Sequence, residues 1–234
     1  MRHDSRRRDR RCLPGSAAAI AALMLLESPA FAAQPPKTWD GLVQVNSKRL
    51  DFVYLQPGAD FRGYTKVMID PAEVAFRKDW RKDYNSSHRS LSSRVSQPDV
   101  DRVITAGIAA ANDIFAKAWT DGGYAIVDAA GPDVLRIRTG ILNIRVNAPD
   151  MQQPGRSFSF APEAGSATLF VEARDSVTGA LLGRAVDNEF AGDNMNAWRT
   201  QVSNRADFRD LVDSWAKTTV RGMSELKALS PIAE

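Results

Sequence analysis

A long run of apolar residues in the middle of the chain has the spacing of an amphipathic helix. Between Val100 and Trp119 these residues recur every three or four positions, which places them on one face of a helix. Ser96 and Asp99 precede the run at the spacing of an N-terminal cap, and Asp121-Gly122-Gly123 follows it with residues that end helices. We therefore predict one long helix from about residue 98 to residue 121.

A second run with the same spacing lies near the C-terminus. Apolar residues from Phe208 to Leu226 again recur every three or four positions. Asn204 and Asp207 stand before them and offer an N-terminal cap. These residues predict a second long helix.

Shorter apolar segments, several of which alternate apolar with polar residues, are typical of strands. We predict strands in residues 48–55, 64–70, 73–76, 124–127, 134–146, 167–174 and 180–190. The phase of the alternation changes near Gly140–Leu142, which predicts a β-bulge there. Residues 175–179 predict a hairpin turn with Gly179 at positive φ.

These elements predict the fold class. Each helix has one apolar face and each strand has one or two, so both kinds of element must cover one another. The economical arrangement is an α+β fold, a mostly antiparallel sheet with two long helices packed on one face. We predict a single α+β domain over residues 48–230.

The N-terminal residues have the pattern of an export signal. Six Arg precede an apolar run, residues 17–26, and Ala30 and Ala32 then place small residues where signal peptidase reads them. The run is shorter than the roughly 20 residues that a membrane span needs. We predict a signal peptide over residues 1–32, a linker over residues 33–47, and a mature protein without a transmembrane segment in the periplasm or cell envelope.

Removal of the signal peptide changes the charge. The whole chain has a formal net charge of +3, and residues 1–32 account for all of it. The remaining chain is formally neutral, so the composition does not favour a nucleic-acid partner. Cys12, the only cysteine of the sequence, lies before the apolar run, so the mature chain has no thiol and no disulfide.

The side chains that usually carry chemistry are sparse. His88 is the one histidine after the signal, in a polar Ser-rich segment without a nearby acid, and zinc would need more ligands than one histidine provides. Glu172, Asp175, Asp187 and Glu189 could pair for acid–base work, but they also suit the wet face of a hairpin opposite Arg residues. We predict no catalytic residue, no cofactor and no metal site.

One segment stands out by its charge. Residues 77–97 hold six Lys or Arg against two Asp, a net charge of +4, and six Ser. We expect a loop without regular structure that contacts an anionic partner, with Trp80 as a possible anchor among the cations Arg77, Lys78, Arg81 and Lys82. The alternative is a solvated loop whose charges are balanced elsewhere.

Several short motifs resemble a known family. They are Leu50-x-x-Val53-Tyr54, Pro57-Gly58-Ala59-Asp60, Tyr64-x-x-Val67-Met68-Ile69-Asp70-Pro71-x-x-Val74-x-Phe76, Trp80 and Asp175-Ser176-x-Thr178-Gly179. Together they are similar to the domain of unknown function 3313, a family of exported bacterial proteins of which many look like lipoproteins. The chain departs from that pattern because no cysteine follows its apolar run. The resemblance implies export and implies no activity.

These observations favour an exported envelope protein that acts as a non-catalytic binding or assembly factor. Its expected partner is an anionic envelope component or another envelope protein. The alternative is a carboxylate-based hydrolase of the periplasm, and a deep pocket with convergent carboxylates would distinguish it.

Overall fold

The computed structural model describes residues 35–88, 94–147, 158–161, 163–192 and 197–233. The predicted signal peptide, residues 1–32, lies outside these residues. In the described ranges, no helix is both long and apolar enough to cross a membrane.

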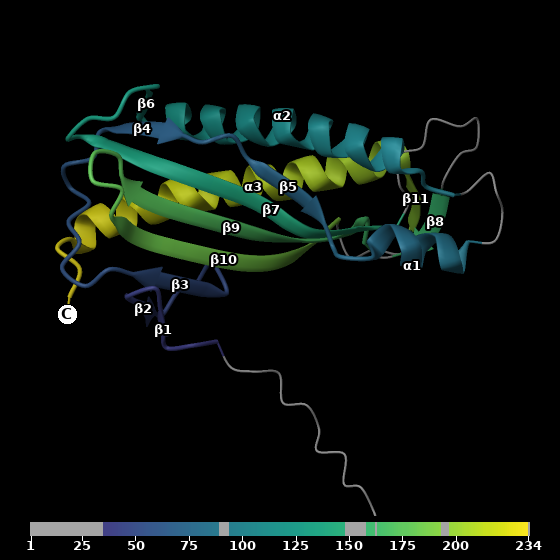
Figure 1. Ribbon diagram of the computed structural model, residues 1–234, viewed down its shortest axis with the longest axis horizontal. Coiled ribbons are helices and arrows are strands. Elements are labelled where there is room, and N and C mark those ends of the chain that lie inside the picture. The colour runs from purple at the N-terminus through teal and green to yellow at the C-terminus, as the bar shows by residue number, and fades with distance from the viewer. Residues whose placement is uncertain (1–34, 89–93, 148–157, 162, 193–196, 234) are drawn as a thin grey trace, which may run out of the picture. The chain divides into compact units, whose positions relative to one another are not determined.

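The main sheet has nine strands in the order β1-β2-β3-β10-β9-β7-β4-β6, and β5 pairs with β7 as well (Figure 1). A separate two-stranded sheet joins β8 and β11. The strands are β1 (Thr38–Trp39), β2 (Leu42–Val45), β3 (Phe52–Leu55), β4 (Lys66–Ile69), β5 (Glu73–Phe76), β6 (Ala125–Ile126), β7 (Val134–Val146), β8 (Phe158–Ala161), β9 (Gly165–Asp175), β10 (Leu181–Ala191) and β11 (Ala197–Thr200). The helices are α1 (Trp80–Ser87), α2 (Gln97–Asp121) and α3 (Gln201–Leu229).

The sheet is mixed, whereas we predicted a mostly antiparallel one. β4 runs parallel to both β6 and β7, and β5 runs parallel to β7. The cause is the long α2 between them, because a helical crossover returns the chain in the same direction. Pro71 separates β4 from β5, so the two short strands pair with successive parts of β7.

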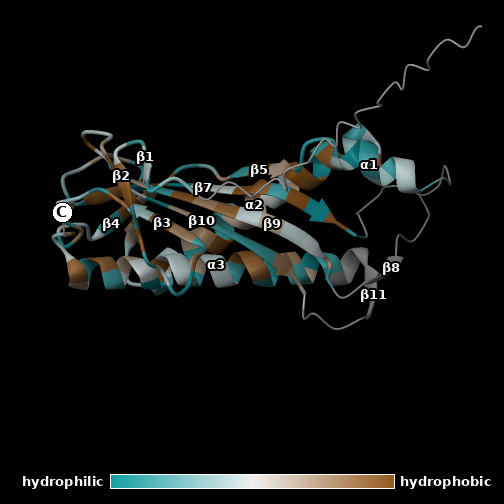
Figure 2. Cartoon of the chain, turned by 90° about the horizontal axis from the view of Figure 1, so that it is seen from below, coloured by the Kyte–Doolittle hydropathy of each residue, from teal (hydrophilic) through white to brown (hydrophobic). Residues whose placement is uncertain are grey.

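The two long helices pack on one face of the sheet, as predicted. α2 and α3 contact each other, and both contact strands of the sheet. Along α3, apolar and polar residues alternate, as one apolar face requires (Figure 2). The core between helices and sheet contains Leu135, Ile137, Leu169, Phe115, Trp119, Trp215 and Ala216, each at most 3% exposed.

The predicted β-bulge is present in β7, a little later than expected. The pairing of β7 with β9 shifts between Leu142 and Arg145. Asn143 adopts φ 52 at this point. After the shift, Ile144 points into the core, which explains the change of phase in the sequence.

The turn and cap predictions have different outcomes. Gly179 has φ 72, so the predicted positive φ is confirmed. Ser96 caps α2 through a capping box with Asp99, also as predicted. The predicted cap at Asn204 is wrong, because α3 follows β11 directly at Gln201 and Asn204 lies buried inside the helix.

The stretch predicted as a linker, residues 33–47, contains two strands of the main sheet. β1 and β2 form a hairpin at its edge, and β2 pairs with β3. Leu42 is completely buried and anchors this hairpin. This hairpin could not be predicted from a repeated pattern, because β1 has only two residues and β2 only four.

Candidate functional site

The basic segment, which we predicted to be a loop, contains the helix α1. Trp80 and Tyr84 lie one turn apart on it, and they are 5% and 9% exposed. Both pack in a small apolar cluster with Val95 from the segment before α2. Two buried aromatic residues in an eight-residue helix are too few to show a helical period in the sequence.

Trp80, which we named as a possible anchor for a partner, is buried in this cluster. Its ring stacks on that of Phe76, with the ring centroids 4.5 Å apart. The ring centroid of Tyr84 lies 5.6 Å from that of Trp80, and the ring of Tyr84 stacks on that of His88 with the centroids 4.0 Å apart. These aromatic contacts fix α1 against the end of the sheet and leave its polar side to the solvent.

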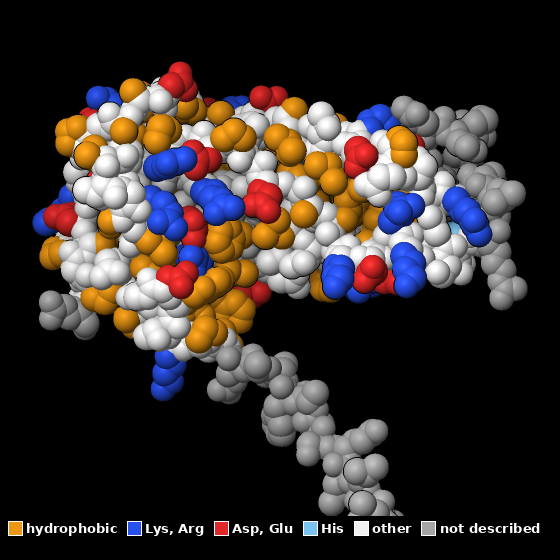
Figure 3. Space-filling view, in the orientation of Figure 1, with side chains coloured by type: hydrophobic (Ala, Val, Ile, Leu, Met, Phe, Trp, Pro, Cys, Tyr) orange, Lys and Arg blue, Asp and Glu red, His pale blue; other side chains and the backbone are white. Residues whose placement is uncertain are grey.

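Of the predicted cations, Arg81 and Lys82 lie on that polar side of α1, and Arg77 and Lys78 lie just before the helix. Arg77, Lys78, Arg81 and Lys82 are all exposed, and Figure 3 shows Lys and Arg side chains gathered around α1. Arg77 pairs with Asp83 at 2.6 Å. Within the described ranges, the other three cations form no ion pair, so they remain available to an anionic partner. We call these four residues the α1 cations.

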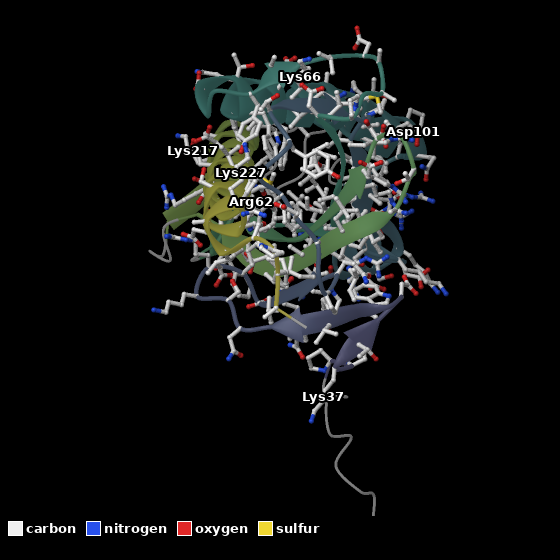
Figure 4. The ribbon with its side chains drawn as sticks, turned by 90° about the vertical axis from the view of Figure 1, so that its left-hand side faces the viewer. Lys37, Arg62, Lys66, Asp101, Lys217 and Lys227 are labelled. Atoms are coloured by element: carbon white, nitrogen blue, oxygen red, sulfur yellow. The ribbon has the colours of Figure 1, made fainter. Side chains whose placement is uncertain are left out.

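Several cations at the opposite end of the molecule are ion-paired. Figure 4 views this end and labels Arg62, Lys66 and Lys217 among others. Arg62 pairs with Asp60 at 2.6 Å, Lys66 pairs with Asp133 at 3.1 Å, and Lys217 pairs with Asp213 at 2.6 Å. Of the α1 cations, by contrast, only Arg77 has such an acidic partner in the described part of the chain.

An apolar cavity of about 550 Å³ lies between α2, α3 and the sheet. Trp80 lines it together with residues of β5, α2, β7 and α3, among them Val74, Val103, Ile144 and Phe208. Because Trp80 belongs to both features, α1 separates the cavity from the exposed cations. The volume is within the usual range of small-molecule sites.

The polar residues of this cavity are mostly basic. Arg102, Arg205 and Arg209 line it, against one carboxylate, Asp99. Asp99 is 5% exposed and accepts hydrogen bonds from Ser96 and Arg102. Arg102 pairs with Asp99 at 3.1 Å, so this carboxylate and one of the arginines are held together at the edge of an otherwise apolar cavity.

A different cluster of charges lies on the sheet face opposite the helices. Glu172 is 3% exposed, and Arg184 donates to its Oε1 at 2.6 and 3.0 Å. Arg174 pairs with the other carboxylate oxygen at 3.2 Å. Burial opposes the ionisation of Glu172, but these two guanidinium groups outweigh it and lower the pKa. Trp39 covers the cluster, with the guanidinium carbon of Arg184 4.0 Å from its ring centroid.

The other candidate carboxylates do not join Glu172. Asp175 accepts hydrogen bonds within its turn from Thr178, and these lower its pKa. Asp187 points to the helix side of the sheet, where the indole nitrogen of Trp215 donates to it at 2.8 Å. We expected these carboxylates on the solvated face of a hairpin, opposite Arg residues. Glu172 does pair with Arg174 and Arg184, but it is buried, and Asp187 is buried under α3.

Asp187 and Glu189 share a polar pocket of about 460 Å³ with Asp207, Asp210 and Arg49. In the described part of the chain, no group of three or more His, Cys, Asp or Glu residues is arranged to hold a metal ion. The pocket therefore has acidic walls without a metal-binding geometry.

The arrangement defines a class of protein, an α+β domain with two helices on one sheet face and a basic helix beside an apolar cavity. A family model described as "Protein of unknown function (DUF3313)" matches residues 36–219. The chain belongs to this family. No curated protein matches it.

Solved structures resemble the chain only distantly. A PelC dodecamer from Paraburkholderia phytofirmans is 12% identical with a TM-score of 0.35, and the match covers 70% of this chain and 94% of that one. A minor lipoprotein from Acinetobacter baumannii is 10% identical with a TM-score of 0.33, over 69% of this chain and 94% of that one. Likenesses of this size carry no function to this protein.

Proposed function

We propose that this protein is an exported, non-catalytic binding factor of the bacterial cell envelope, and that the α1 cations contact an anionic envelope component. The observation that carries the proposal is the exposure of Lys78, Arg81 and Lys82 without acidic partners in the described part of the chain. A cluster of cations near an anionic surface gains about 1 kcal/mol for each Lys or Arg. The three unpaired cations would therefore contribute about 3 kcal/mol.

The rigidity of the helix favours a surface role for these charges. The stacking of Trp80 on Phe76 and the apolar cluster with Val95 hold α1 in place, so little backbone entropy is lost when its cations bind. Residues 33–234 are formally neutral, so the net charge of this part of the chain does not by itself attract an anionic partner. A partner with densely spaced anionic groups, such as a lipid headgroup layer, fits this chemistry.

The rival function, a carboxylate-based hydrolase, is less well supported. Its candidate residues Glu172 and Asp187 point to opposite faces of the sheet, and each is held by a donor in the folded chain. Burial opposes the ionisation of Glu172, but its arginine partners outweigh it and lower its pKa, whereas a general acid needs a raised pKa. We therefore propose binding in place of catalysis.

The test is co-sedimentation of the mature protein with vesicles of phosphatidylcholine, with and without phosphatidylglycerol. Replacement of Arg77, Lys78, Arg81 and Lys82 by Ser should weaken binding to the anionic vesicles by about two orders of magnitude, the equivalent of about 3 kcal/mol. The matched control replaces four exposed, ion-paired cations by Ser, namely Arg62, Lys66, Lys117 and Lys217.

The control variant loses the same formal charge and should bind like the wild type. Binding should also weaken as salt is added, since exposed charges are screened over about 8 Å at physiological ionic strength. Equal losses in the two variants would show a net-charge effect without a specific surface, and would contradict the proposal.

A further inference from the structure

The apolar cavity has an opening between the two long helices. Most of its lining is buried or half-buried, and Trp80, Ile114 and Ile144 are among the buried residues. The exposed lining residues are Ala106 on α2 and Arg205, Ala206 and Arg209 on α3. The exposed positions therefore mark the opening, and two of them are arginines one helical turn apart.

The volume limits what can enter. A cavity of about 550 Å³ is within the range of small-ligand sites, and it has room for one acyl chain of ordinary length. The lining is dominated by Val, Ile, Ala and Phe side chains, which suits a hydrocarbon chain and no polar ligand.

The charge at the opening selects the other end of the ligand. Arg205 and Arg209 are exposed beside the apolar lining, and the side chain of Arg102, across the cavity on α2, is 34% exposed. Guanidinium groups match carboxylate and phosphate oxygens in shape and charge. An anionic group at the end of a buried chain would therefore lie among these arginines.

We infer that this cavity binds a single-chain anionic amphiphile, whose hydrocarbon chain fills the space between α2, α3 and the sheet and whose headgroup lies at Arg205 and Arg209. The inference rests on the proposed function and deepens it, because it names the class of envelope molecule that the protein takes up. The free fatty acid is the simplest member of that class.

Calorimetric titration of the mature protein with sodium dodecanoate tests the inference. We expect one binding site. Octanoate, with four fewer methylenes, should bind about two orders of magnitude more weakly, since each buried methylene changes affinity about fourfold. Dodecyltrimethylammonium should bind about tenfold more weakly than dodecanoate because its charge is reversed, and dodecyl phosphate should bind about as well as dodecanoate.

Two substitutions on α2 provide a matched pair. Ala110 lines the cavity, whereas Ala109 is exposed on the same helix and does not. Ala110→Phe should reduce dodecanoate affinity at least about tenfold because it fills the space, and Ala109→Phe should leave it unchanged. Ala106→Leu is a second filling variant if Ala110→Phe lowers the helix content. The double variant Arg205→Gln, Arg209→Gln should lose the preference for the anionic headgroup.

Three results would overturn the inference: no binding of dodecanoate to the wild type, equal affinity in Ala110→Phe and Ala109→Phe, or equal affinity for the cationic amphiphile. The vesicle experiment remains separate. The variant without the α1 cations should still bind dodecanoate, so a failure of vesicle binding alone contradicts the surface contact and not the cavity.

Discussion

Replacement of Glu172 by Gln tests whether the buried charge cluster on the sheet face opposite the helices stabilises the fold. The substitution keeps the shape of the side chain and removes its charge. It leaves the guanidinium group of Arg184, 6% exposed, with Asp40 as its remaining acidic partner, and Asp40 is itself 60% exposed. Removal of one member of a buried ion pair costs about 3–5 kcal/mol. Because Asp40 and the ring of Trp39 still contact Arg184, we expect about 3 kcal/mol, the lower end of this range.

The measurement is urea denaturation followed by circular dichroism, with Glu73→Gln as the control. Glu73 pairs with Arg138 at 3.1 Å, but both side chains are more than half exposed, so its loss should cost less than about 1 kcal/mol. The double variant Glu172→Leu, Arg184→Met should be more stable than Glu172→Gln, since no buried charge is then left unpaired.

The loss of unfolding free energy caused by Glu172→Gln should depend on pH. The pKa of Glu172 is lower in the folded protein than its ordinary value of 4.5. Its stabilising effect is therefore complete above pH 4.5 and is lost as the pH falls through the folded-state pKa. The difference in the free energy of unfolding between wild type and Glu172→Gln should shrink in acid. If Glu172→Gln costs no more than Glu73→Gln at neutral pH, the cluster does not stabilise the fold in this way.

Three further substitutions test single features by the free energy of unfolding. Gly179→Ala should cost about 1 kcal/mol, because φ is 72 and no atom lies within 4 Å of an added Cβ, so backbone strain is the whole effect; an unchanged denaturation midpoint would contradict this. Trp215→Phe should cost about 1–3 kcal/mol more than Trp119→Phe, because it leaves Asp187 without its indole donor. The indole nitrogen of Trp119 has no hydrogen-bond partner among the described residues. Equal costs would show that the hydrogen bond from Trp215 to Asp187 does not stabilise the fold. Ser96→Ala should cost about 1 kcal/mol by removing the cap of α2, and a loss near zero would mean that the capping box is not needed.

The sequence was sufficient to predict those elements in which many residues follow one repeating apolar and polar pattern. The long helices, the hairpin at Gly179 and the bulge in β7 all follow from repeated local patterns. Short elements lack such repetition. β1, β2 and α1 were missed because each is short and depends on one or two buried side chains, such as Leu42 and Trp80, which are too few to show a period.

The candidate site was predictable only in part. The α1 cations were visible as a charge excess, and the structure adds that three of them have no acidic partner in the described ranges while Arg77 has one. The cavity was not predicted, because its lining comes from β5, α1, α2, β7 and α3 and its residues look like ordinary core positions. The arginines around it lie on two helices about a hundred residues apart in sequence, so no local motif links them.

The central claim, that α1 is the surface that contacts an anionic partner, can be measured directly with a fluorescent label. Residues 33–234 contain no cysteine, so one can be introduced at Ser86, which is exposed on α1 and carries no charge. A cysteine at Ser224, exposed near the far end of α3, provides the control. With an environment-sensitive label, anionic vesicles should shift the emission of the Ser86→Cys protein toward the blue and leave that of Ser224→Cys unchanged. An unchanged spectrum at position 86, with the protein bound to the vesicles, would contradict the account.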